Sequence, residues 1–354
     1  MSSLKGMFKV ICPEAQSKRE RKVNDIVKRL GVITPDKVHL KNYPIDNPVT
    51  IFNPAFIIEN GNDIKLYARI VLGYFTYTSA VAELEIPIPD IYSLKIMSHY
   101  SADIVVYPSM RFDMWGVEDP RVYEIDGKIC MTYCGRTISY FNPAVRIERT
   151  LPVTAIRENG WKKICVFRLP SKIRKHVVSD KDSFITRGGK DYLLFHRPHL
   201  TNTYEKYHLT VSRIPKFGWN KSFREFTVED TKVVFEPAAF EERMGWGPAP
   251  IKVGKEHLFL IHAVDKEQVA YRLFAALFDL NNGVQVKAIT PYYIMRPKMP
   301  YEVYGDRPHT IFPCGAQKVD DKIIISYGAA DSAVAFGEIN LSNLLSILDK
   351  NRLD

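Results

Sequence analysis

Charged and amide side chains stand at matching places along this chain, just before and just after short apolar runs. The side chains before the runs are Asn53, Glu118, Asp119, Lys181, Asp182 and Arg307. Those after the runs are Arg69, Arg136, His196, Arg197, His262, Asp265 and Asp331. Carboxylates and cations that converge on one concave place are typical of an active site. Scattered over a surface, the same side chains would only cap strand ends and pair with each other, so the fold decides between the two interpretations.

Five similar segments carry these side chains. Their equivalent positions are Pro54, Pro120, Ser183, Ala249 and Gly315, at steps of 66, 63, 66 and 66 residues. Each segment has the pattern of two β-strands around a polar or Gly-rich turn, such as Asp126-Gly127 in the second segment. Further strand-like runs lie between the segments, for example at 103–107 and 273–280. A unit of about 65 residues with four short strands, repeated five times, predicts a five-bladed β-propeller.

We therefore predict an all-β fold with short N- and C-terminal helices, and a single domain over residues 1–354. The propeller is expected over about 50–340, after an N-terminal extension over 1–49, and a C-terminal helix over 341–354. Its last strand is expected from residues 333–340 or from the N-terminal segment. A parallel βαβ fold is the rival, but it would need helical patterns between the strands.

The N-terminal extension contains a basic cluster at 18–22, followed by Val23, Ile26, Val27 and Leu30 at helical spacing. We expect a surface helix near 18–30 that packs on the body. A subunit contact in a homo-oligomer and an anion-binding arm are the alternatives.

Composition excludes several classes of protein. The chain has 354 residues, a net charge of +9 and 46% hydrophobic residues, which excludes intrinsic disorder. Five dispersed cysteines argue against a disulfide scaffold, and their spacing does not predict a metal site. No apolar run reaches the roughly 18 residues of a membrane helix, and the N-terminus lacks a signal-peptide pattern. We expect a cytoplasmic protein without a membrane or nucleic-acid partner, a metal or an organic cofactor.

The run Gly116 to Arg121, GVEDPR, resembles the signature of glycoside hydrolase family 130, the β-mannoside phosphorylases and related β-mannosidases. Other similar pieces follow in order, including Asn53-Pro54-Ala55, His196-Arg197-Pro198 and Gly328-Ala329-Ala330-Asp331. The resemblance spans about residues 50–340 and also implies a five-bladed propeller. It implies phosphorolysis with inversion, in which phosphate attacks the anomeric carbon of a β-mannosyl unit. The products would be α-mannose 1-phosphate and a shortened acceptor.

The same resemblance implies roles for individual residues. Asp119 is similar to the family's proton donor, which is thought to act through a sugar hydroxyl. The residues that resemble the mannose-binding set are Asn53, Arg69 and Asp331. The residues that resemble the phosphate clamp are Lys181, Arg197, Arg243 and a charged His262. Two further residues, Tyr271 and Tyr304, are candidates for stacking on sugar rings. Glu118 has two interpretations, a second functional carboxylate or a structural partner of Arg121 or Arg136, and we favour the structural one.

The chemistry of the residues agrees with phosphorolysis. An inverting glycosidase normally needs a second carboxylate as a base for water, whereas phosphate is already an anionic nucleophile and needs cations. Four basic candidates favour inorganic phosphate as co-substrate, with a β-mannoside oligosaccharide or a mannosyl disaccharide as the other partner. A β-mannosidase and a mannosyltransferase on the same fold are the enzyme alternatives, and a non-catalytic carbohydrate-binding propeller is the alternative from another class. Both β-1,2 and β-1,4 linkages stay open.

Overall fold

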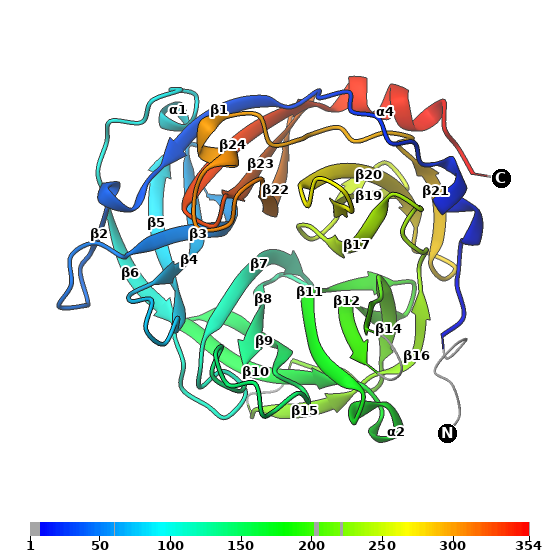
Figure 1. The fold of residues 1–354 in the computed structure, drawn as a ribbon, viewed down its shortest axis with the longest axis horizontal. Coiled ribbons are helices and arrows are strands. Elements are labelled where there is room, and N and C mark those ends of the chain that lie inside the picture. Colours follow the sequence, from blue (N-terminus) through cyan, green and yellow to red (C-terminus); the bar gives the residue numbers. More distant parts are fainter. Residues whose placement is uncertain (1–7, 60, 202–204, 220–221, 354) are drawn as a thin grey trace.

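A computed structural model describes residues 8–59, 61–201, 205–219 and 222–353. Its strands form five sheets around a central axis, which Figure 1 shows end-on. Each sheet is one blade, and the first strand of each repeated unit lies nearest the axis. The predicted five-bladed β-propeller is therefore confirmed.

Most strands of a blade lie beside the next strand in the chain, but β2 pairs with β6 and β15 pairs with β10 at the outer edges of the first two blades. Blade 1 consists of β2 (Val38–Leu40), β3 (Thr50–Glu59), β4 (Asp63–Val71), β5 (Ser79–Pro87) and β6 (Tyr100–Val106). Blade 2 consists of β7 (Val117–Ile125), β8 (Lys128–Arg136), β9 (Thr150–Glu158), β10 (Gly160–Arg168) and β15 (Arg224–Thr227). Blade 3 consists of β11 (Val177–Gly188), β12 (Asp191–Thr201), β13 (Glu205–Tyr207), β14 (Thr210–Ile214) and β16 (Glu229–Val233).

Blade 4 consists of β17 (Glu241–Trp246), β18 (Ile251–Val253), β19 (Glu256–Asp265), β20 (Tyr271–Asp279) and β21 (Gln285–Ile289). Both β17 and β18 pair with β19, so they are two halves of one inner strand. The interruption contains Pro248 and Pro250, which have no N–H to donate to the sheet.

Blade 5 joins the two ends of the chain. It consists of β22 (Ile311–Val319), β23 (Lys322–Ala329), β24 (Ala333–Asn340) and, on its outer edge, β1 (Lys28–Ile33). The pairing of β1 with β24 is antiparallel, with Lys28 opposite Glu338. Residues 333–340 and the N-terminal segment thus both supply strands to the last blade, and this pairing closes the ring.

The predicted N-terminal helix over 18–30 is wrong. A short 3₁₀ helix covers Pro13–Lys18, and the chain then runs extended along the rim of the ring from blade 4 to β1 (Figure 1). Its backbone amides bind a neighbouring segment: Asn24 N–H donates to Tyr293 O at 2.8 Å and Ile26 N–H to Ile294 O at 3.0 Å. These contacts satisfy the backbone without a helix, and tertiary pairing overrides the local spacing.

The C-terminal helix is present as α4 (Leu341–Asp349). Asn340 caps it by accepting a hydrogen bond from Asn343 N–H, and Leu344 and Leu348 are buried. The remaining helices are the short turns α1 (Ile88–Ile91), α2 (Ser171–Arg174), α3 (Pro300–Val303) and η2 (Pro35–Lys37). In the described part of the chain, no helix has the length and apolar character needed to cross a membrane.

Candidate active site

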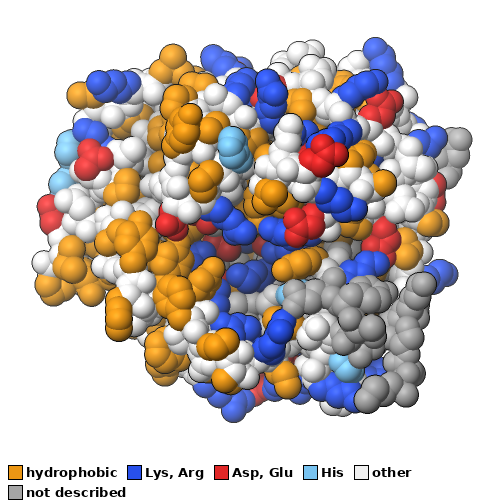
Figure 2. Space-filling view, viewed as in Figure 1, with side chains coloured by type: hydrophobic (Ala, Val, Ile, Leu, Met, Phe, Trp, Pro, Cys, Tyr) orange, Lys and Arg blue, Asp and Glu red, His pale blue; other side chains and the backbone are white. Residues whose placement is uncertain are grey.

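A cavity of about 360 Å³ opens at the centre of the ring, and Figure 2 shows acidic and basic side chains gathered in this hollow. Its basic lining residues are Arg69, Arg136, Lys181, Arg197 and Arg307. Its acidic lining residues are Glu118, Asp119, Asp182, Asp306 and Asp331. The other lining residues are Asn53, Tyr77, Tyr140, Phe141, Tyr271, Thr310 and Phe312. All five blades contribute, and ten of the thirteen polar residues singled out beside the repeated runs line the cavity. The other three do not: His196 binds Asp180, Asp265 binds Arg21, and His262 lies behind Asp182.

Three of these residues are presented by the same backbone device. Asn53, Asp119 and Asp182 have φ angles of 48°, 51° and 51°, and each lies where the inner strand slips in register against its partner. Such a β-bulge re-aims a side chain, and Asn and Asp tolerate the left-handed conformation better than most residues. The bulges therefore direct these three side chains to the axis.

Asp119 is held by two donors. Asn53 Nδ2 donates to its Oδ1 at 2.7 Å, and an Arg69 guanidinium nitrogen donates to the same oxygen at 3.0 Å. Both contacts go to Oδ1, which leaves Oδ2 available to a ligand in the cavity. A carboxyl group oriented in this way is placed to hand over a proton.

The neighbouring Glu118 is the anchor of an ion network. Arg136 grips it with bonds of 2.7 and 3.1 Å, Arg69 binds it at 3.1 Å and Lys181 at 3.2 Å. Burial favours the neutral acid, but Arg136, Arg69 and Lys181 outweigh it and hold the pKa of Glu118 well below its ordinary value. The expected partner Arg136 is present, whereas Arg121 instead binds Asp182 at 3.3 Å.

Asp182, on the inner strand of the third blade, lies against two basic side chains. Arg197 Nε lies 2.5 Å from one of its oxygens, and His262 Nε2 lies 3.4 Å from the same oxygen. Burial opposes ionisation, but Arg197, His262 and Arg121 lower the pKa of Asp182. Asp182 is therefore a charged residue that positions Arg197.

His262 does not match the expected charged ligand of phosphate. It is buried behind Asp182 and is not among the residues that line the cavity. Burial lowers the pKa of His262 despite the adjacent carboxylate, so the imidazole is neutral at pH 7. The geometry makes it a support for Asp182.

Three guanidinium groups alternate with two tyrosine rings along one side of the site. Arg197 lies 5.2 Å and Arg243 5.5 Å from the ring centre of Tyr207. Arg243 and Arg307 lie 5.8 and 5.3 Å from the ring centre of Tyr271. Arg307 faces the cavity, whereas Arg243 lies outside its lining, beside the Tyr271 hydroxyl at 3.4 Å. This row concentrates positive charge where an anion could bind.

Asp331 differs from the other carboxylates of the cavity. Burial raises its pKa to about 6, because the desolvation outweighs the opposing effects of Arg307 and Arg69. It is thus a carboxyl that carries a proton in part of the population near pH 6, at a place where sugar hydroxyls could donate to it or accept from it.

The cavity contains seven of the ten residues expected in the site. These are Asn53, Arg69, Asp119, Lys181, Arg197, Tyr271 and Asp331. Arg243 and His262 lie just outside it, and Tyr304 is 75% exposed and also outside it. Lining residues for which no role in binding substrate or phosphate was predicted include Arg136, Arg307, Tyr77 and Tyr140. The sequence pattern does single out the two arginines, because they stand beside the repeated hairpins, whereas the two tyrosines come from loops that do not repeat.

Within the described ranges, no three His, Cys, Asp or Glu side chains could together hold a metal ion.

The sequence and the fold are similar to those of known proteins. Residues 17–350 match the glycoside hydrolase 130 family, described as beta-1,4-mannooligosaccharide phosphorylase. A beta-1,2-mannobiose phosphorylase of Thermoanaerobacter sp. (strain X514) is 27% identical over 85% of this chain and 96% of its own. A 1,2-beta-oligomannan phosphorylase of the same strain is 29% identical over 83% of this chain and 91% of its own. The solved structure of the beta-1,2-mannobiose phosphorylase from Listeria innocua, in complex with beta-1,2-mannobiose, superposes with a TM-score of 0.69 and 19% identity. It covers 92% of this chain and 99% of its own. On the match over almost the whole length, the chain belongs to glycoside hydrolase family 130.

Proposed function

We propose that this protein is an inverting β-mannoside phosphorylase. The observation that carries the proposal is the pairing of an oriented acid, Asp119, with the cations Lys181, Arg197 and Arg307 in one cavity. A binding module would need no oriented acid, and a hydrolase would need no concentration of positive charge. The names of the relatives, which are mannobiose and oligomannan phosphorylases, support the same substrate class.

In the proposed reaction, a β-mannosyl unit lies against Asn53, Arg69 and Asp331. A phosphate oxygen, held by Lys181, Arg197 and Arg307, forms a bond to the anomeric carbon from the α face. The bond from that carbon to the glycosidic oxygen breaks, and the proton of Asp119 passes through a sugar hydroxyl to the departing oxygen. Positioning the two reactants supplies much of the rate, because their encounter becomes intramolecular.

Hydrolysis is the second candidate, and Asp331 is the observation that favours it. Glu118 and Asp182 are fixed in ion pairs, whereas Asp331 makes no ion pair among the described residues and has a raised pKa. A carboxylate of this kind is a candidate base for water on the face opposite an acid.

The deciding experiment compares cleavage with and without phosphate. The protein is incubated with β-1,2-mannobiose or β-1,4-mannobiose, and the products are followed by proton and phosphorus NMR. We expect α-mannose 1-phosphate to form only when inorganic phosphate is present. Free mannose formed at the same rate without phosphate would favour the hydrolase, and binding without turnover would favour a carbohydrate-binding propeller.

A further inference from the structure

A buried chain of polar side chains crosses the third blade, beside the catalytic cavity but outside its lining. Asp180 on β11, His196 on β12, Ser212 on β14 and Thr231 on β16 follow one another from the inner strand to the outer strand. His196 Nδ1 lies 2.7 Å from Asp180 Oδ2, and His196 Nε2 lies 2.8 Å from Ser212 Oγ. Ser212 Oγ in turn lies 2.8 Å from Thr231 Oγ1. We refer to these four residues as the blade 3 polar chain.

The first three residues have the composition of a Ser-His-Asp triad, but their burial excludes nucleophilic catalysis. Asp180, His196 and Ser212 are 2%, 0% and 1% exposed. A nucleophilic serine must reach the carbonyl carbon of its substrate, whereas the Ser212 hydroxyl is enclosed between His196 and Thr231. The blade 3 polar chain therefore acts on chemistry only through the residues that it holds in place.

Two members of this chain are sequence neighbours of cations in the cavity. Asp180 precedes Lys181, and His196 precedes Arg197. Lys181 and Arg197 are directly opposite each other in the register of β11 and β12, and both line the cavity. Successive side chains of a strand point to opposite faces. The contact between Asp180 and His196 therefore connects the two strands on the side that faces away from the cavity.

This connection lies where the backbone pairing of the two strands is interrupted. The register of β11 against β12 shifts between Lys181 and Phe184. A bulge of this kind leaves a residue unpaired and disrupts the ladder of backbone hydrogen bonds. His196 stands on β12 opposite the shift, and its side chain reaches back to β11 through Asp180. The side-chain contact thus supplies a cross-strand bond where the backbone pairing is irregular.

Neighbouring blades hold the backbone of both residues. Trp246 Nε1 of blade 4 donates to His196 O and to Thr210 O, each at 3.1 Å. Thr150 Oγ1 of blade 2 donates to Asp180 O at 3.4 Å. In the described part of the chain, Asp180 Oδ1 has no hydrogen-bond partner, so the contact with His196 is the main compensation for burying this carboxylate. Three blades therefore meet at the pair of Asp180 and His196.

The two cations beside this pair are already engaged by carboxylates. Lys181 Nζ donates to Glu118 at 3.2 Å, and Arg197 Nε lies 2.5 Å from Asp182. An anion in the cavity can bind only the donors that remain, and lysine and arginine have three and five N–H donors. Binding an anion and a carboxylate together thus requires a definite position of each cation. A small shift of either strand would misalign these remaining donors.

We propose that the blade 3 polar chain positions Lys181 and Arg197 to bind phosphate, with Asp180 and His196 as positioning residues. The inference rests on the proposed function. It adds a determinant of phosphate affinity that is buried behind the cavity and touches neither substrate.

The test replaces the buried pair without leaving a buried charge. The double variant Asp180→Leu/His196→Leu exchanges both residues for apolar side chains, a change that folded proteins often tolerate. His196→Asn keeps an amide nitrogen close to the place of Nδ1 and is the conservative variant. Thr132→Val is the matched control, because Thr132 belongs to a buried polar chain of blade 2, 2.6 Å from the Tyr123 hydroxyl and 2.8 Å from Thr154 Oγ1.

We expect the double variant to raise the phosphate KM roughly tenfold, the value of one charge-assisted hydrogen bond, and to leave the mannoside KM at the wild-type level. His196→Asn should recover most of this loss, and Thr132→Val should keep the wild-type phosphate KM whatever its melting temperature. If the double variant does not fold, Asp180→Asn decides by the same criterion, with an expected rise of roughly threefold. An unchanged phosphate KM, or equal rises of both KM values, would overturn the proposal.

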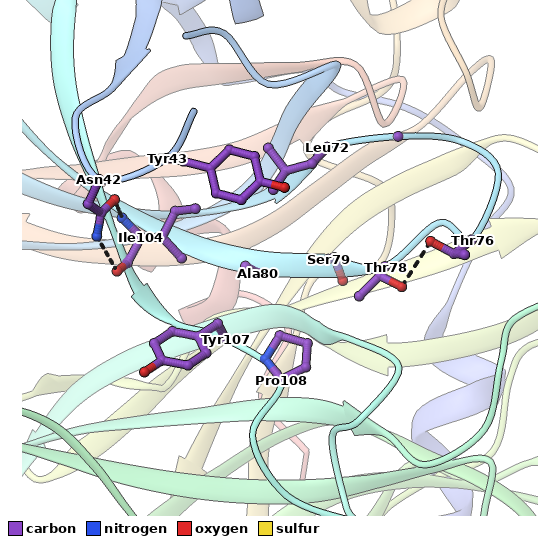
Figure 3. Close-up of a pocket in the computed structure, with 11 residues that line it drawn as sticks. Asn42, Tyr43, Leu72, Thr76, Thr78, Ser79, Ala80, Ile104, Tyr107 and Pro108 are labelled. Carbon is purple, nitrogen blue, oxygen red and sulfur yellow. Dashed lines mark hydrogen bonds between the residues drawn. The ribbon is translucent and has the colours of Figure 1, made fainter. Parts of the chain in front are cut away.

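Calorimetric titration of inorganic phosphate without mannoside tests the positioning independently of turnover. A larger cavity of about 540 Å³ lies on blade 1 between Tyr43 and Tyr107 (Figure 3), but none of its described lining residues is charged, so it offers phosphate no cation. If the wild type binds phosphate but cleaves no β-mannoside, the proposed function fails, and weaker binding by the double variant would still support the positioning. Equal phosphate affinities of the wild type and the double variant would overturn the positioning alone, and a wild type that binds no phosphate would overturn both.

Discussion

Asp119 and Glu118 are adjacent residues with different environments. Glu118 receives bonds from three cations and stays charged, whereas Asp119 is bound through one oxygen and keeps the other for a ligand. The bulge between them and Arg121 explains the contrast, because it turns successive side chains in different directions.

Asp119→Asn should remove the proton donor without disturbing the fold, since the two side chains are nearly the same size. We expect phosphorolysis to fall by about 10² to 10⁴, with an unchanged melting temperature. Steady-state kinetics and a thermal melt measure both. An activity above about a tenth of the wild type would exclude Asp119 as the acid.

Asp331 should make stability depend on pH. Its folded pKa of about 6 exceeds the ordinary 3.8, so the stabilisation from the neutral acid is complete below about pH 3.8 and is lost as the pH rises through about 6. Asp331→Asn does not lose this stabilisation, because the amide does not ionise. In urea melts, the free energy of unfolding of Asp331→Asn should therefore rise relative to that of the wild type between pH 4 and pH 7, by about 3 kcal/mol at most. A constant difference across this range would contradict a raised pKa.

The sequence could place Asp119, Lys181 and Arg197 in the cavity because the repeat superimposes the ends of the hairpins that carry them. It could not decide which side chains are screened by a neighbour. His262 and Arg243 occupy the expected end of blade 4, but Asp182 and Tyr271 stand between them and the cavity.

At the scale of elements, the position of a bulge on an inner strand also depends on close packing against a neighbouring strand. Gly328 on β23 lies against the bulge of β3, and a Cβ there would stand 1.9 Å from Asn53 Oδ1. Asn53 is the residue that orients Asp119, so this close approach connects strand packing to the acid.

Gly328→Ala should displace Asn53 and with it Asp119. We expect kcat to fall roughly 100-fold, as for a misplacement of about 1 Å, and stability to fall by about 1–3 kcal/mol. Gly73→Ala is the control, since its Cβ meets nothing. If both variants turn over mannoside alike, the contact between β23 and β3 has no role in orienting the acid.

The same scale shows which elements a sequence can predict. Each hairpin was predictable because strands and turn residues lie within about 20 residues of one another, so the signal is local. The segment over 18–30 was not, because its backbone partners lie near residues 291–294 and 334–338. Its helical spacing reflects the burial of Val27 and Leu30 in the body of the ring.

At the scale of the whole molecule, β1 closes the ring, and Arg29 fastens it. Its guanidinium binds the fully buried Glu302 at 2.8 Å, Asp25 at 2.8 Å and the carbonyl of Arg296 at 2.6 Å. The anchor therefore joins β1 to α3, which precedes the loop that carries Arg307.

Arg29→Met should leave the Glu302 charge buried without its cation. We expect the free energy of unfolding to fall by about 3–5 kcal/mol, read from urea denaturation. Lys28→Met, on the exposed face of the same strand, should change it little. Similar effects of the two variants would mean that the ion pair does not fasten the ring.

The pairing of β1 with β24 also determines when the ring can close during synthesis on the ribosome. Ile33 and Ala333 are 300 residues apart, so β1 is synthesised roughly 15–60 s before its partner strand, at roughly 5–20 residues per second. Until then, the edge of β1 that pairs with β24 has no native hydrogen-bond partner, and the fifth blade is incomplete. A nascent chain that ends before β24 therefore cannot close the ring, which makes the synthesis of β24 the step that commits the chain to its native topology.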